Sequence, residues 1–362
     1  MKTSLQHLQS LIAFPTISRD SNLALINYVR DFLASLQIES DIVASPDGHK
    51  ANLWATIGPR DVPGIVLSGH SDVVPVAGQS WSSDPFSLTE RDGRLFGRGT
   101  ADMKGFIACC LHAIEAASKQ KLTVPIHLAL SYKPRLCIVG EPTLMQAITA
   151  HKGKVSFRAV AHGLEAHSSL SPQGANAIYM ASDLIGAIRS IQRDIAAKFQ
   201  QDDDYDVPYT TLHVGKIFGG EVLNIVPNEC SFDFEIRFLP SDDAGAITSR
   251  IRQAADDISA EYKAVFPDAR IELIELQSYP ALSTPVDSEA VKFVHALTGG
   301  NSTGKISFGT EAGLFQEKLD IPAIVCGPGH IAVAHKPDEY ITADQMARCD
   351  SMLKRLLEIL SR

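Results

Sequence analysis

Residues 64–72 read GIVLSGHSD, and this stretch decides the fold class of the chain. An unbroken apolar run such as Ile65-Val66-Leu67 is typical of a strand buried on both faces, as in a parallel sheet. Similar runs occur at residues 52–57, 124–130, 135–139 and 321–326, and helical apolar stripes at 23–36, 104–118 and 343–360. Because helices alternate with short apolar strands, the sequence predicts an α/β domain with a mostly parallel sheet flanked by helices.

The middle of the chain follows a two-residue period instead. Residues 154–161 and 230–238 alternate between apolar and polar side chains, with Phe232, Phe234 and Ile236 on one side of the second run. Such strands are half exposed, as in an antiparallel sheet covered on one face, and helical patterns at 175–192 and 244–262 would cover it. We therefore expect an inserted α+β domain at residues 153–272 and a discontinuous catalytic domain made of residues 1–152 and 273–362.

Composition excludes several classes of protein. The chain has 362 residues, 45% of them hydrophobic, and a net charge of −9 without a block of Lys or Arg. This argues against disorder and against a nucleic-acid or anionic-membrane partner. The six cysteines show no C-x-x-C spacing, no signal peptide is evident, and no apolar run is long enough to span a membrane. We expect a soluble protein of a reducing compartment, the cytoplasm.

Potential metal ligands follow the apolar strands. His70 and Glu141 come directly after two of them, His335 follows the run at 321–326, and Asp102 lies in the Gly-rich segment GRGTADMKG that leads into a helix. Ligands bind beyond the carboxyl ends of strands in open α/β sheets, so these groups can meet at one edge.

Histidine and carboxylate together favour zinc or a similar divalent ion. Asp72 is well placed to hold the second nitrogen of His70, and a bridging carboxylate such as Asp102 would let two ions lie ~3.5–4 Å apart. The alternative is that each residue is an ordinary hydrogen-bonded loop residue, which is the commoner role for a single histidine after a strand. The spacing by itself predicts a metal-dependent hydrolase and nothing finer.

Eight segments carry a family resemblance along nearly the whole chain. They are SGHSDVVP, WSSDPFSL, GRGTADMKGF, VGEPT, AHSS around His167, LNIVPNEC, GTEAG and AHKPDEY. The sequence resembles the zinc-dependent amidohydrolase family that includes acetylornithine deacetylase, succinyl-diaminopimelate desuccinylase and aminoacylase, and the last segments look most like the first of these.

The resemblance implies a catalytic domain with two divalent metal ions, zinc first, with cobalt or manganese as alternatives. His70, Asp102 and Glu141 would hold one ion, Asp102 would bridge to a second ion held by His335, and Asp72 would orient His70. The inserted domain would act as a lid and as the interface of a homodimer.

The resemblance also implies residues that bind the substrate. His167 would reach the active site of a partner subunit and stabilise the oxyanion, a role that needs a preorganised donor. Asn224, Arg237, Gly309 and Thr310 would line the substrate site. From the residues alone, Arg237 could equally pair with acids on its own strand, and Asn224 could be a turn residue.

The reaction that this implies is hydrolysis of the amide bond of an N-acyl amino acid. N-acetylornithine, cleaved to ornithine and acetate in arginine biosynthesis, is the expected substrate. A desuccinylase or aminoacylase specificity stays open.

The chain departs from the family after Ser131. Family members continue here into two adjacent acids, a general base and a ligand of the second metal, whereas this chain reads Tyr132-Lys133-Pro134 and enters the next strand at Arg135. A parallel connection needs a dozen or more residues, so three residues could form only a hairpin. A hairpin would reverse the second strand and carry Glu141 ~20 Å to the opposite edge of the sheet.

Two interpretations follow. Either a crossover segment of the natural protein is absent from this sequence, or the deletion is real and the chain is a catalytically impaired family member whose second metal site is incomplete. The survival of every other candidate residue favours the first interpretation.

Overall fold

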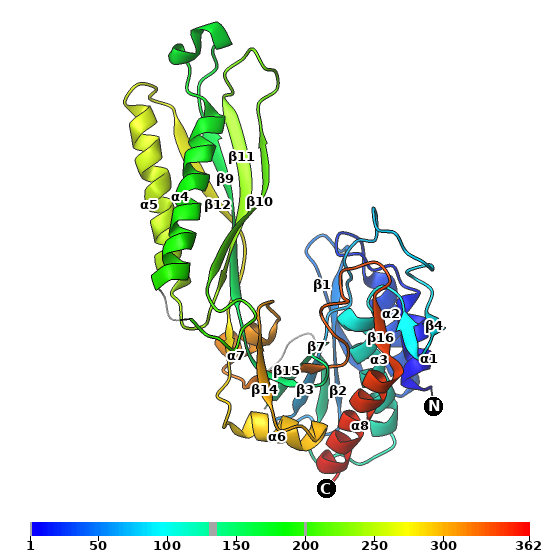
Figure 1. Ribbon diagram of the computed structural model, residues 1–362. Coiled ribbons are helices and arrows are strands. Elements are labelled where there is room, and N and C mark those ends of the chain that lie inside the picture. The colour runs from blue at the N-terminus through cyan, green and yellow to red at the C-terminus, as the bar shows by residue number, and fades with distance from the viewer. Residues whose placement is uncertain (1, 130–135, 199–200) are drawn as a thin grey trace. The chain divides into compact units, whose positions relative to one another are not determined.

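The computed structural model describes residues 2–129, 136–198 and 201–362 (Figure 1). The chain divides into two compact units, each with its own apolar core. Unit 1 comprises Met1–Thr149, Thr284–Gly304 and Thr310–Arg362, and unit 2 comprises Ala150–Ser283 and Lys305–Gly309.

The secondary structure alternates in the first part of the chain, as the apolar runs predict. Up to residue 151 the elements are α1 (Ser4–Ile12), α2 (Leu23–Ser35), β1 (Ser40–Ala44), β2 (Ala51–Ile57), β3 (Ile65–Ser68), β4 (Thr89–Arg91), β5 (Arg94–Phe96), the turn η1 (Thr100–Lys104), α3 (Gly105–Ala117), β6 (Ile126–Ala129), β7 (Leu136–Pro142) and β8 (Ala147–His151). From residue 282 onward the elements are β13 (Leu282–Ser283), α6 (Glu289–Thr298), β14 (Thr303–Ile306), α7 (Ala312–Leu319), β15 (Ala323–Gly327), β16 (Tyr340–Thr342) and α8 (Ala343–Leu360).

The main sheet is mixed, with a parallel centre. Its strands follow the order β1-β2-β6-β3-β7-β15-β8-β13, and β14 pairs with β8. The four central strands β6, β3, β7 and β15 are parallel, whereas β1, β2, β8 and β13 pair in antiparallel fashion at the two sides. A smaller sheet has the order β16-β5-β4. The predicted α/β class is confirmed, with a sheet that is parallel at its centre and antiparallel at its two sides.

The strands on either side of β3 settle the direction of β7. Ser68 of β3 lies opposite Ala129 of β6 and opposite Val139 of β7, and both pairings are parallel. Glu141 is therefore at the same edge of the sheet as His70, as the predicted parallel strands require, and the reversal that a hairpin would impose on this strand is not found. Strand β7 pairs with β3 on one side and with β15 on the other, so it lies at the centre of the sheet. All seven of its residues are buried there, as expected for a central strand of a parallel sheet. The predicted departure between Ser131 and Arg135 lies outside the described residues.

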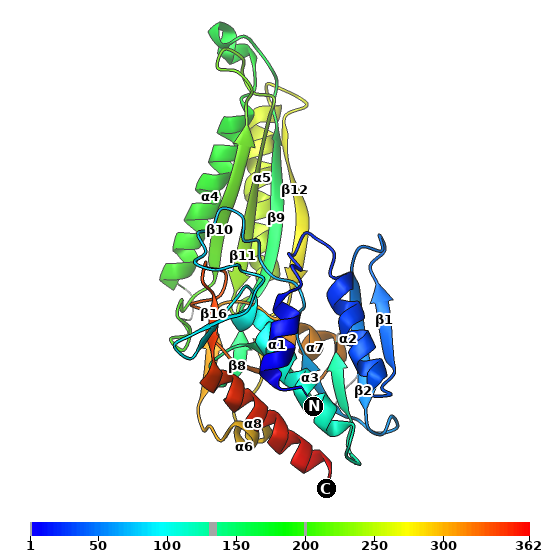
Figure 2. The same cartoon turned by 90° about the vertical axis from the view of Figure 1, so that its right-hand side faces the viewer.

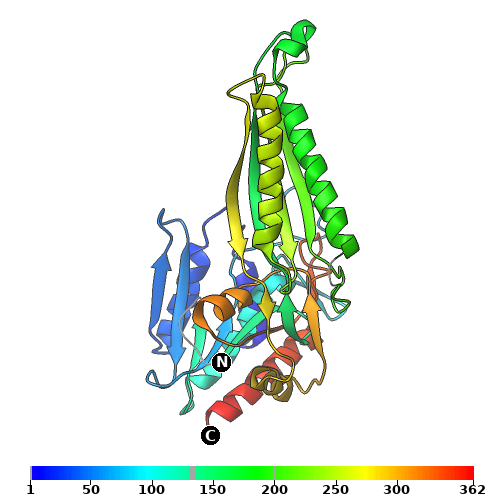
Figure 3. The same cartoon turned by 90° about the vertical axis from the view of Figure 1, so that its left-hand side faces the viewer.

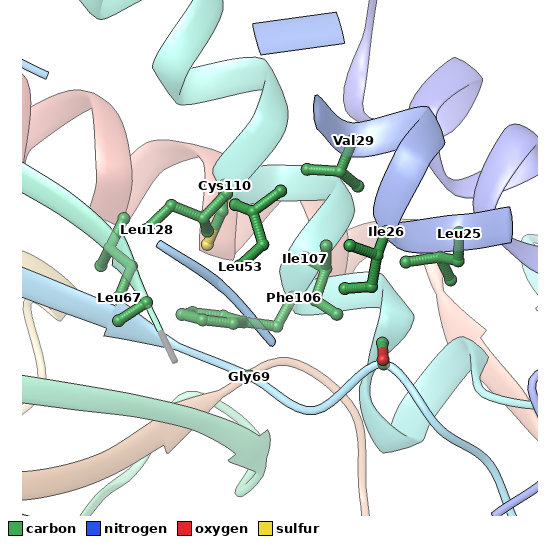
Figure 4. A pocket seen from close by; sticks show the side chains of 12 residues that line it. Leu25, Ile26, Val29, Leu53, Leu67, Gly69, Phe106, Ile107, Cys110 and Leu128 are labelled. Atoms are coloured by element: carbon green, nitrogen blue, oxygen red, sulfur yellow. The ribbon is translucent and has the colours of Figure 1, made fainter. Parts of the chain in front are cut away.

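Helix α3 occupies the centre of unit 1 because it is apolar on nearly all sides. It packs against α1 and α8, as Figure 2 shows, and contributes ten buried residues to the core. Between α2, α3 and the sheet lies a cavity of about 40 Å³ whose lining includes Leu25, Val29, Phe106 and Leu128 (Figure 4). This lining is apolar, so we assign the cavity to the core.

Unit 2 is an antiparallel sheet covered by two helices. Its elements are β9 (Gly153–His162), η2 (Ser168–Gln173), α4 (Ala177–Lys198), β10 (Thr211–Gly219), β11 (Glu229–Phe238), α5 (Ala244–Lys263) and β12 (Arg270–Tyr279), with strand order β10-β11-β9-β12. Helices α4 and α5 lie side by side on one face of this sheet (Figure 3). Phe232, Phe234 and Ile236 of β11 are buried beneath them, whereas Asp233 and Glu235 are half-buried, as the alternation predicts.

The helices within the described ranges were compared with the length and apolar character that a membrane span requires. None of them meets both conditions.

Candidate metal centre

The structure gathers His70, Asp102, Glu141 and His335 at the carboxyl edge of the parallel strands. His70 follows β3, Glu141 lies near the end of β7, and His335 follows β15 in a loop. Asp102 comes from η1, which leads into α3. Parallel strands end at one edge of a sheet, which is why residues so far apart in sequence meet here.

Asp102 is the centre of this cluster. Its Oδ1 lies 2.9 Å from Nε2 of His70, and its Oδ2 lies 2.9 Å from Nε2 of His335. Glu141 Oε1 is 3.7 Å from the same nitrogen of His70, and one ligand atom each of His70, Asp102 and Glu141 lie within 4.8 Å of one another. The two carboxylate oxygens of Asp102 thus face two different imidazoles, which is the arrangement of a bridging carboxylate.

The electrostatics of the cluster suit a bound cation. Burial raises the pKa of the Glu141 carboxyl well above its ordinary value, and the neighbouring Asp102 raises it further. Burial would also raise the pKa of Asp102, but hydrogen bonds from His335 and His70 hold that pKa far below its ordinary value. For His70, burial would lower the pKa, yet hydrogen bonds to Asp102 and Asp72 and the charge of Glu141 raise it well above the usual range.

Two buried carboxylates with two imidazoles form a donor set of the kind that holds zinc and similar divalent ions. A cation placed among them would take over the charge balance that protonated imidazoles otherwise provide. These residues therefore fit a divalent metal.

Asp72 contacts the outer nitrogen of His70 in two ways. The Nδ1 atom lies 3.0 Å from the backbone carbonyl of Asp72 and 3.5 Å from its Oδ1. The hydrogen bond with His70 is the main reason that the pKa of Asp72 falls to about 2. Both contacts favour a proton on Nδ1, which leaves Nε2 of a neutral His70 available as a metal ligand.

Glu339 holds the loop that carries Asp102, and the sequence analysis missed this role. Its Oε1 accepts hydrogen bonds from the backbone N–H groups of Gly99 (3.1 Å), Ala101 (3.0 Å) and Asp102 (3.0 Å). Its Oε2 accepts a hydrogen bond of 2.6 Å from Nη1 of Arg98, and both side chains are only 1% exposed. The segment AHKPDEY was among the family markers, but a carboxylate that binds backbone amides has no signature in sequence.

Another histidine, His330, lies between β15 and His335 and is not part of the cluster. His330 is exposed, and its Nδ1 accepts a hydrogen bond of 2.8 Å from the backbone N–H of Ala332. This is the ordinary loop role that the sequence left open for each single histidine.

Two of the predicted substrate residues lie next to each other in unit 2. His167 is exposed, and its Nδ1 is 2.8 Å from Oγ of Ser169 and accepts a hydrogen bond of 3.2 Å from the N–H of that residue. The carbonyl of Asn224 accepts a hydrogen bond of 2.9 Å from the N–H of Ser168. Asn224 lies in a turn, which is the alternative that the sequence left open for it.

Arg237 pairs with an acid on its own strand. Its Nε donates a hydrogen bond of 2.9 Å to Glu235, and its Nη1 donates one of 2.7 Å to the hydroxyl of Tyr279. The ring of Tyr279 lies so close to Gly309 that a Cβ there would be 2.0 Å from it, so Arg237 and Gly309 both contact this tyrosine. Thr310 is buried in unit 1, where its hydroxyl accepts a hydrogen bond of 3.0 Å from the N–H of Ala312 at the start of α7.

Comparison with known proteins finds one family and several relatives. Residues 66–359 match the model of peptidase family M20/M25/M40. Acetylornithine deacetylase of Klebsiella pneumoniae is 34% identical over 92% of this chain and 91% of its own length, and that of Yersinia pestis is 32% identical over the same shares.

Solved structures share the fold at low identity. An M20 family metallo-carboxypeptidase from Sulfolobus solfataricus superposes with a TM-score of 0.80 at 20% identity, over 100% of both chains. A dinuclear metal-binding peptidase of the M20 family from Bacillus subtilis gives a TM-score of 0.63 at 14% identity, over 99% of this chain and 97% of its own. With a family model that matches most of its length and curated relatives above 30% identity, the chain belongs to peptidase family M20/M25/M40.

Proposed function

We propose that this chain is a metal-dependent hydrolase that cleaves the amide bond of an N-acyl amino acid. The observation that carries the proposal is the buried Asp102, whose two carboxylate oxygens each face an imidazole beside Glu141. N-acetylornithine is the substrate we propose, because relatives over 30% identical along nearly the whole chain bear the name acetylornithine deacetylase. The reaction would then belong to arginine biosynthesis.

The proposed metals are two divalent ions, zinc first, with cobalt or manganese as alternatives. His70, Asp102 and Glu141 would hold one ion, and Asp102 with His335 would hold the other. When bound, such ions polarise an acyl carbonyl and activate water as the nucleophile. Asp72 keeps the proton of His70 on Nδ1, and Glu339 keeps Asp102 in its loop, so both residues preorganise the centre.

Unit 2 would supply the substrate contacts and the interface of a homodimer. His167 is exposed, with its Nδ1 held by Ser169, so its Nε2 could donate to an oxyanion. Arg237 would bind the substrate carboxylate, and Asn224, Gly309 and Thr310 would be further residues of the substrate site. Because Arg237 pairs with Glu235 in this structure, substrate binding would have to compete with that ion pair.

Release of acetate from N-acetylornithine tests this proposal. The chain is stripped with chelator and assayed before and after addition of Zn²⁺, Co²⁺ or Mn²⁺. We expect activity only with metal, and we expect His70→Ala to abolish it. His330→Ala is the matched control, because His330 is exposed and outside the cluster.

Two results would contradict it. Full activity in the chelator-stripped chain excludes a metal mechanism. Faster hydrolysis of N-succinyl-diaminopimelate or of N-acetylmethionine keeps the mechanism but replaces the substrate with that of a desuccinylase or an aminoacylase.

A second candidate is a family member that binds metal without turnover. It is favoured by the sequence between β6 and β7, since residues 130–135 read LSYKPR and contain no acid. This candidate predicts one ion per chain, held by His70, Asp102 and Glu141. Metal analysis that finds two ions per chain would exclude it.

A further inference from the structure

Glu311 places one more carboxylate at the edge of the sheet where the metal ligands lie. It immediately precedes α7, and its Oε1 accepts a hydrogen bond of 2.9 Å from Oγ of Ser68. Ser68 is the last residue of β3, two residues before His70. All three residues belong to unit 1, so the strand that leads to His70 also fixes the position of Glu311.

Glu311 is near the buried acids and open to solvent. Burial is the main reason for the raised pKa of Glu141, and the negative charge of Glu311 is among the further causes. Glu311 and Ser68 line a hollow of about 400 Å³ with the apolar side chains of Leu314 and Phe315. Water can therefore reach the Glu311 carboxylate.

Hydrolysis of an amide needs a group that accepts a proton from the attacking water. Near the centre, within the described ranges, Glu141 is a proposed metal ligand, and three further carboxylates already have charged or multiple partners. Asp102 pairs with two imidazoles, Asp72 pairs with His70, and Glu339 binds Arg98 and three backbone amides. The carboxylate of Glu311 accepts its hydrogen bond from a neutral hydroxyl, through Oε1.

The position of Glu311 also matches the place where this chain lacks acids. Ala129, the last residue of β6, lies opposite Ser68 in the parallel register. An acid that followed β6 would therefore emerge beside the end of β3, and residues 130–135 supply none. Glu311 reaches the same end of β3 from α7.

We propose that Glu311 is the general base of this chain. The proposal rests on the hydrolase function proposed above. The oxygen of water forms a bond to the acyl carbon while its proton moves to Glu311. The C–N bond then breaks, and Glu311 passes that proton to the departing amine nitrogen, so one acid and one amine leave and the carboxylate is restored.

Glu311→Gln tests the proposal in the metal-loaded chain with N-acetylornithine. We expect kcat to fall about 10²–10⁴-fold. Metal content, and substrate affinity measured by calorimetry, should stay within about threefold of the wild-type values, because Glu311 is not one of the proposed metal ligands. Glu311→Asp should recover part of the lost kcat, since it keeps a carboxylate. Glu317→Gln is the control, because Glu317 is exposed on the same helix and pairs only with Lys318.

The outcomes separate this proposal from the hydrolase function. If Glu311→Gln keeps the wild-type kcat, or if it loses activity only because metal is lost, Glu311 is not the base but the hydrolase stands. If the wild-type chain binds metal and hydrolyses no N-acyl amino acid, both proposals are overturned.

Discussion

Asp102 can face two imidazoles at once because its own backbone is held still. Glu339 binds the backbone N–H groups of Gly99, Ala101 and Asp102 with one oxygen and Arg98 with the other. Glu339 is 1% exposed, so these hydrogen bonds form without competition from water. Glu339 thus fixes the backbone that carries Asp102.

Glu339→Gln tests this dependence. The substitution leaves the buried guanidinium of Arg98 without its charge partner, and a single amide oxygen cannot replace both carboxylate oxygens. We expect a loss of stability of about 3–5 kcal/mol and a 10–100-fold weaker affinity for Zn²⁺. Urea unfolding and competition with a metal indicator measure the two effects. Glu358→Gln, an exposed site on α8, should change neither, and an unchanged affinity in Glu339→Gln would contradict the role.

His7 gives the stability of the protein a specific pH dependence. It is fully buried in α1, packs edge-on against Phe32, and has no hydrogen-bond partner for either ring nitrogen within the described structure. Burial lowers the pKa of His7 to about 4, below the ordinary value of 6.5.

Between these two values the unfolded chain binds a proton that the folded chain does not. The contribution of neutral His7 is therefore complete above pH 6.5 and is lost as the pH falls toward 4, by at most about 3 kcal/mol. His7→Leu should flatten this part of the curve of unfolding free energy against pH. If the unfolding free energies of the wild type and of His7→Leu change with pH in the same way, His7 is not the source of this pH dependence.

The residues of the metal centre differ in how far sequence could find them. His70, Asp72, Asp102, Glu141 and His335 follow apolar strands or a Gly-rich helix entry, so the topology of an α/β sheet predicts that they meet. Glu339 and Glu311 could not be found this way, because their partners are backbone amides and a serine hydroxyl distant in sequence.

At the scale of elements, β7 depends on a glycine where it passes α3. A Cβ at Gly140, the residue before Glu141, would lie 2.0 Å from the ring of the buried Phe106. Gly186, in the exposed part of α4, has no atom within 4 Å of such a Cβ. The first glycine is required by packing, whereas the second only weakens its helix.

Two alanine substitutions should therefore have opposite effects. Gly140→Ala should destabilise the protein by about 1–3 kcal/mol, because the ring or the strand must move. Gly186→Ala should stabilise it by up to about 1 kcal/mol through helix propensity. Urea unfolding of both variants checks this. If Gly140→Ala leaves the free energy of unfolding unchanged, the Phe106 ring can move aside without an energetic cost.

Periodicity predicted most elements, whereas the length of the connection after β6 conflicted with the predicted sheet. The two-residue alternation located β11 and its buried face, and the apolar stripe located α3 to within a residue at each end. A hairpin after Ser131 would reverse the next strand, whereas β7 runs parallel to β3, as the apolar runs predict. The direction of β7 follows from the burial of apolar strands on both sides of β3. A rule based on the length of the connection does not take this pairing into account.

At the scale of the whole molecule, the proposed metal ligands are confined to one of two independent cores. His70, Asp102, Glu141 and His335 all belong to unit 1, whose apolar cluster shares no residue with that of unit 2. A ligand that binds only the folded state stabilises the unit that holds it, by about 2.7 kcal/mol at a concentration of 100 Kd.

Hydrogen exchange should resolve this effect along the chain. On addition of Zn²⁺ to the chelator-stripped protein, we expect slower exchange of backbone amides in β3, β7 and α3, whose ends carry the ligands. Amides of β9, β11 and α5 in unit 2 serve as the internal control and should keep their rates. His70→Ala should remove the protection from unit 1. Equal protection of both units by metal would contradict independent cores, because binding energy would then be shared by the two units.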